Sequence, residues 1–70
     1  MYEFHYFYDE NTSGIPDKIT PLKYKNDEDA FVSLDHEQEY LHGSRSPYSV
    51  SLMKDGKNMS KEFLAWVGRE

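Results

Sequence analysis

The chain has 70 residues, no cysteine and a formal net charge of −5, with 13 acidic against 8 lysine and arginine side chains. Neither a disulfide nor a thiolate metal site can stabilise it, so we expect one small domain that relies on packed aromatic rings, on a partner or on a second copy. The shortage of basic side chains argues against direct nucleic-acid binding, because phosphates are met by lysine and arginine.

The first strand is expected over residues 1–8, because aromatic side chains recur there at every second position and so share one face. These side chains are Tyr2, Phe4, Tyr6 and Tyr8. Residues 9–17 are rich in Asn, Ser, Gly and Pro and indicate a loop. A second strand follows over 18–25, with Thr20, Leu22 and Tyr24 facing inward. Pro21 suits an edge strand because it has no N–H to donate.

A helix is expected to begin at Asn26, which is a good N-cap. Asp27, Glu28 and Asp29 place negative charge at the positive end of the helix dipole. One face has mostly apolar residues at helical spacing. It consists of Ala30, Phe31, Leu34, Gln38 and Leu41. Gly43 is expected to be the C′ residue, just past the end of the helix.

A third strand is predicted over 48–54, followed by Asp55-Gly56, a pair typical of a type I′ hairpin turn, with a short return strand near 57–59. Ser60 can cap a short final helix, although a strand over 63–67 is the alternative. The fold class is therefore α+β. An antiparallel sheet of three to four strands packs against one main helix in ββαβ order, with a short C-terminal helix.

The chemistry of the chain favours binding over catalysis. The segment Asp9 to Gly14 matches part of a calcium-binding EF-hand loop, but position 12 of that loop is Thr20 instead of the required glutamate. The three histidines lack metal-ligand spacing, and no serine lies in a nucleophile motif. We therefore predict a protein that is not an enzyme and that has no catalytic residue, cofactor or metal.

The expected helix carries six carboxylates and no lysine or arginine over residues 26–42. At about 100° per residue, Glu28, Asp35 and Glu39 line one flank, while Glu37 borders the apolar face. Exposed helices ordinarily mix charge signs, because like charges at i,i+4 destabilise them. One interpretation is a solvated face that keeps the protein in solution. The other is a surface that binds a basic partner protein. The contact residues would then be Glu28, Asp29, Asp35, Glu37, Glu39 and Tyr40.

In its size and acidity the whole chain resembles the small inhibitor proteins that phages and mobile elements encode, anti-CRISPR proteins among them. The resemblance implies an inhibitor or modulator that docks its acidic helix on the basic surface of a host complex, including one that handles nucleic acid. The N-terminus lacks the pattern of a signal peptide, and the apolar run 63–67 is too short to span a bilayer. We therefore expect a soluble protein of the cytoplasm, which is the host cytoplasm if a phage encodes it.

Two other functions compete with this interpretation. The chain could be a structural or accessory subunit that forms a homodimer, or extends a sheet, through its aromatic N-terminal strand. It could also be a small nuclease or calcium-dependent factor, which predicts activity or a melting shift with divalent ions.

Overall fold

Strands and helices follow one another in the order ββαββα in the computed structural model of the chain, which describes residues 1–68. The elements are β1 (Tyr2–Tyr8), β2 (Lys18–Leu22), α1 (Asp27–Gly43), β3 (Tyr48–Lys54), β4 (Lys57–Asn58) and α2 (Ser60–Val67). The predicted α+β class with an antiparallel sheet is confirmed. The predicted ββαβ order is only partly matched, because the chain after the Asp55-Gly56 turn adds β4 and then α2.

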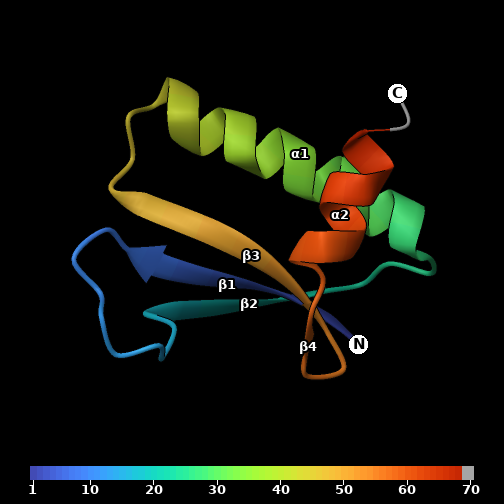
Figure 1. The fold of residues 1–70 in the computed structure, drawn as a ribbon, viewed down its shortest axis with the longest axis horizontal. Coiled ribbons are helices and arrows are strands. Elements are labelled where there is room, and N and C mark those ends of the chain that lie inside the picture. Colours follow the sequence, from blue (N-terminus) through green and yellow to red (C-terminus); the bar gives the residue numbers. More distant parts are fainter. Residues whose placement is uncertain (69–70) are drawn as a thin grey trace.

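The sheet has the strand order β2-β1-β3-β4, with every pair antiparallel. Both helices lie on the same side of this sheet (Figure 1). The register places Phe4 of β1 opposite Thr20 of β2 and Leu52 of β3, so these three side chains point toward the helices. β1 is hydrogen-bonded on both sides, so within residues 1–68 only β2 and β4 are edge strands.

The core consists of the helix-facing side of β1 and β3 together with the apolar faces of both helices. Alternation buries Tyr2, Phe4 and Tyr6, as the period-two pattern predicts. From α2, Phe63 lies 5.9 Å from the ring of Phe31, and Trp66 lies 5.7 Å from the same ring. These aromatic contacts hold α2 on α1, and the segment 63–67 is helical, not a strand.

Three local predictions are wrong. β2 ends at Leu22, and Tyr24 does not face the core but is 37% exposed, with its hydroxyl 2.7 Å from Ser33 Oγ. Gly43 still belongs to α1, and the residue with left-handed backbone is Arg45, at φ 54°. Ser60 is the first residue of α2 instead of its cap, and its backbone N–H donates to Asn58 Oδ1 at 2.8 Å.

The turn between β3 and β4 should respond to loss of its glycine. Gly56 has φ +84° and Asp55 has φ 50°, the left-handed pair of a type I′ turn. We expect Gly56→Ala to lower the free energy of unfolding by about 1 kcal/mol, because alanine is strained at positive φ. Gly43→Ala is the matched control, because Gly43 is helical and its added methyl meets open space.

Urea unfolding of both variants measures this difference. Gly43→Ala should raise stability by about 0.5 to 1 kcal/mol, since alanine is the better helix former. A loss of stability in both variants, or in neither, would contradict the turn geometry.

Candidate functional site: the acidic helix and its groove

The first carboxylate of α1 is used within the fold. Asn26 caps the helix by accepting the Asp29 N–H at 2.9 Å, and the adjacent Asp27 turns toward β1 and β3. Its Oδ1 accepts the Tyr2 hydroxyl and lies 3.0 Å from Lys54 Nζ. These contacts, the Tyr2 hydrogen bond first, lower the pKa of Asp27. Asp27 therefore ties the start of the helix to the sheet.

A second carboxylate, Glu37, is also engaged by the sheet. It accepts the hydroxyl of Tyr6, a residue that is 7% exposed. Burial, followed by this hydrogen bond and the nearby negative charge, raises the pKa of Tyr6. The sequence-predicted contact residue Glu37 thus lies on the sheet side of α1, with a partner inside the protein.

The other four carboxylates of α1 have no such partner. Among residues 1–68 no cation lies within ion-pair distance of Glu28, Asp29, Asp35 or Glu39. Three of them are exposed and Asp35 is half-buried. Tyr40, about 100° around the helix from Glu39, is also 68% exposed. The structure therefore leaves five of the six predicted contact residues exposed or half-buried on α1, with Glu28, Asp35 and Glu39 on the flank opposite Glu37.

A groove, which we call the α1–β2 groove, lies on the Glu37 side of α1, and its other wall is formed by Tyr24, by β1 and β3, and by Lys18 of β2. It consists of three hollows, and neighbouring hollows share lining residues. The first and second share Ser33 and His36, and the second and third share Glu37 and Tyr40. β2 lies on the far side of β1 from β3, and its helix-facing Thr20 and Leu22 are only half-buried.

The third of these hollows, which we call the tyrosine hollow, has a volume of about 240 Å³. It is lined by Tyr6, Lys18, Glu37, Tyr40, Leu41 and Tyr48. The rings of Tyr6 and Tyr48 meet edge to face at 6.4 Å, and Lys18 Nζ lies 5.2 Å from the centre of the Tyr6 ring. Sequence reasoning did not find this site. The available signal was the spacing of tyrosines by two on a core-facing strand. A buried tyrosine hydroxyl needs a hydrogen-bond partner, so this pattern indicates polar side chains nearby.

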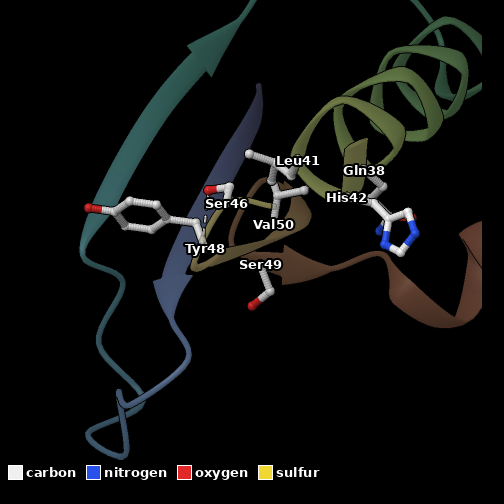
Figure 2. Close-up of a pocket in the computed structure, with 7 residues that line it drawn as sticks. All are labelled: Gln38, Leu41, His42, Ser46, Tyr48, Ser49 and Val50. Carbon is white, nitrogen blue, oxygen red and sulfur yellow. Dashed lines mark hydrogen bonds between the residues drawn. The ribbon is translucent and has the colours of Figure 1, made fainter. Parts of the chain in front are cut away.

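Another hollow, of about 290 Å³, lies between the C-terminal turn of α1 and β3. Figure 2 shows Leu41 and Val50 side by side there, with the Tyr48 ring directed away from His42. Ser46 Oγ accepts the Tyr48 N–H at 3.2 Å. Leu41 and Tyr48 also line the tyrosine hollow, so they form the wall between the two hollows.

The loop between β1 and β2 is held by several internal hydrogen bonds. Asn11 Nδ2 donates to Ile15 O and to Asp17 Oδ2, and Asn11 Oδ1 accepts the Ser13 N–H. The Tyr8 N–H and the Asn11 amide hold the pKa of Asp17 below its ordinary value. Within residues 1–68, no three histidine or carboxylate side chains are grouped so as to hold a metal ion.

Neither described helix has the length and apolar character needed to cross a membrane. Comparisons of the chain with protein-family models, curated proteins and solved structures find no match.

Proposed function

We propose that the protein is a non-enzymatic binding module that inhibits or modulates a host complex by docking α1 on a basic protein surface. One observation carries this proposal. Four carboxylates of α1 are exposed or half-buried with no cationic partner among residues 1–68, and Tyr40 on the same helix is 68% exposed. Clustered negative charge steers association with a positive surface, and exposed aromatic side chains supply binding energy at the centre of interfaces.

The position of the charges along the helix supports a role beyond helix stability. Glu28 and Asp29 lie in the first turn, where the helix dipole favours negative charge. Asp35 and Glu39 lie beyond that first turn, so the dipole does not explain them. They are like charges four residues apart, which destabilises the helix, and a binding role accounts for this cost. A basic groove that ordinarily holds phosphates is a suitable target, in the cytoplasm of the host.

Affinity capture with a matched pair of charge variants tests the proposal. Glu28→Lys/Glu39→Lys reverses two exposed charges of α1. Asp9→Lys/Glu10→Lys makes the same change in net charge on the exposed β1–β2 loop. The captured proteins are identified from a lysate of the host by mass spectrometry, and their affinity is then measured at two salt concentrations.

We expect the helix variant to weaken binding of a basic partner at least about tenfold, with the larger effect at low salt, while the loop variant binds nearly as the natural chain does. Equal binding by the two variants would overturn the proposal.

A homodimeric accessory subunit is the second candidate, and the uncovered face of the sheet favours it. On this face Ile19 is 50% exposed, and Phe7 and Met53 are half-buried. Because β1 is an interior strand, it can offer a partner only this face, and an added strand would have to pair with β2 or β4. A stable dimer in light scattering that Ile19→Lys dissociates and Glu28→Lys/Glu39→Lys leaves intact would favour this candidate.

A further inference from the structure

The tyrosine hollow is built to surround a positive charge. Its ring faces carry the negative side of the aromatic quadrupole, and cations bind there within about 6 Å of a ring centre. Tyr6, Tyr40 and Tyr48 contribute the rings, and Glu37 contributes a carboxylate. The Tyr6 hydroxyl already donates its hydrogen to Glu37. A ligand can therefore contact the face of the Tyr6 ring but cannot accept a hydrogen bond from the Tyr6 hydroxyl.

The protein already places one cation at this position. Lys18 is the residue of β2 directly opposite Tyr6, and its ammonium lies 5.2 Å from the ring centre. Lys18 is exposed and makes no ion pair with a carboxylate among residues 1–68, so its flexible side chain can leave at little cost. The ring therefore accepts an ammonium, and the present occupant is displaceable.

The surroundings favour a cation over an anion as the replacement. The groove continues from this hollow along α1 past Ser33 and His36 to Asp29, which lines its far end. Lys18 is the one lysine or arginine that lines the three hollows. Once it leaves, the groove presents the carboxylates of Glu37 and Asp29 and the rings of four tyrosines, including Tyr24.

We propose that the tyrosine hollow binds the side chain of a lysine or arginine from a basic segment of the partner protein, which replaces Lys18 on the face of Tyr6. The inference rests on the proposed function and assigns it a specific anchoring position. The outward carboxylates attract the basic surface, and the hollow then holds one of its side chains between Tyr6, Tyr40 and Tyr48.

An octalysine peptide is the probe, with amide chemical shifts of the protein followed by NMR at low ionic strength. We expect saturable shifts at Tyr6, Glu37, Tyr40 and Tyr48. The Lys18→Ala variant should bind octalysine about threefold more tightly than the Lys23→Ala variant does. Lys23→Ala is the control, because it removes the same charge from an exposed position outside the groove. General electrostatics would affect these two variants equally, so their difference isolates the hollow.

Tyr40→Ala should weaken octalysine binding about threefold to fivefold. Leu64→Ala is its control, because Leu64 on α2 is also 68% exposed and lies outside the groove. Both residues are exposed, so neither substitution threatens folding. The combined pattern of shifts and affinities would establish the hollow as a cation site.

Shifts confined to Glu28, Asp35 and Glu39, with equal affinity for Lys18→Ala and Lys23→Ala, would overturn this inference. The proposed function would survive that result, because capture of a partner would still depend on Glu28 and Glu39. No binding of octalysine at low ionic strength would also overturn the inference. In contrast, capture that is insensitive to Glu28→Lys/Glu39→Lys overturns the proposed function, while saturable octalysine shifts at the tyrosine hollow would still establish its cation site.

Discussion

Leu34→Ala should lower the free energy of unfolding by about 3 kcal/mol, the largest loss that we predict for a single substitution. Leu34 is 2% exposed and lies on the face of α1 that packs on the sheet. Removing three carbon atoms there loses their transfer energy and leaves a cavity that the surrounding rings fill only in part. For a chain of 70 residues, total stability is about 4 to 10 kcal/mol. The variant therefore loses a large share of it.

Val32→Ala is the matched control for Leu34→Ala. Val32 lies two residues earlier on the same helix and is 39% exposed. Its substitution should change stability by no more than about 0.5 kcal/mol, since little packing is lost at an exposed site. Urea unfolding followed by circular dichroism measures both. Equal losses in the two variants would show that Leu34 is not at the contact between α1 and the sheet.

Leu34 also illustrates what the sequence predicts well. Its burial follows from helical spacing with Ala30 and Phe31, and both of these residues are buried in the structure. The alternation in β1 and the Asn26 cap are confirmed for the same reason. Each depends on residues that are close in sequence, and local geometry determines which face or backbone group they meet.

Where the sequence failed, the cause was a contact between distant segments. Tyr24 continues the alternation of β2, but the strand ends at Leu22, which pairs with Tyr2, the first residue of β1, so Tyr24 has no residue of β1 opposite it. Lys18 reaches the face of Tyr6 only because β2 pairs with β1 in one particular register. Periodicity places a residue on a face of its own strand, but it does not give the order of strands in the sheet.

The same limit applies to the candidate site. The sequence showed six carboxylates on one helix and could separate them only by position along the dipole. The structure separates them by partners, since Tyr2 and Tyr6 each donate a hydroxyl to one carboxylate, across 25 and 31 residues respectively. Glu37 therefore accepts the hydroxyl of Tyr6 and lines the groove, while Glu28 and Glu39 remain available for a partner.

Asp27→Ala should lower the free energy of unfolding by about 2 kcal/mol, although Asp27 is on the helix with the unpaired charges. The substitution leaves the hydroxyl of Tyr2, a residue that is 5% exposed, without its acceptor and removes the partner of Lys54. The Asp27 side chain is 43% exposed, so solvent screening keeps the ion-pair part of this loss small. Asp29→Ala, in the same turn, breaks neither contact and should cost less.

Asp27→Asn separates the charge from the hydrogen bond, because the amide oxygen can still accept from Tyr2. Folding lowers the pKa of Asp27 from its ordinary value of 3.8, chiefly through the Tyr2 hydrogen bond and then through Lys54. The ionised carboxylate therefore stabilises the fold at pH values above 3.8, and this contribution is lost as the pH falls through the lower, folded value. We expect Asp27→Asn to be less stable than the natural chain at pH 7.

The two proteins should converge in stability as acid protonates Asp27 in the natural chain. Asp17, Asp55 and Glu62 also have lowered pKa values, so the variant keeps part of its acid sensitivity and shows a shallower slope. Unfolding in urea at a series of pH values from 7 down to about 2 measures both slopes. Asp29→Asn removes the same charge from the same turn without touching Tyr2 or Lys54, and it controls for the helix dipole. A difference between Asp27→Asn and the natural chain that stayed constant over this range would mean that the ionised carboxylate contributes nothing to holding α1 on the sheet.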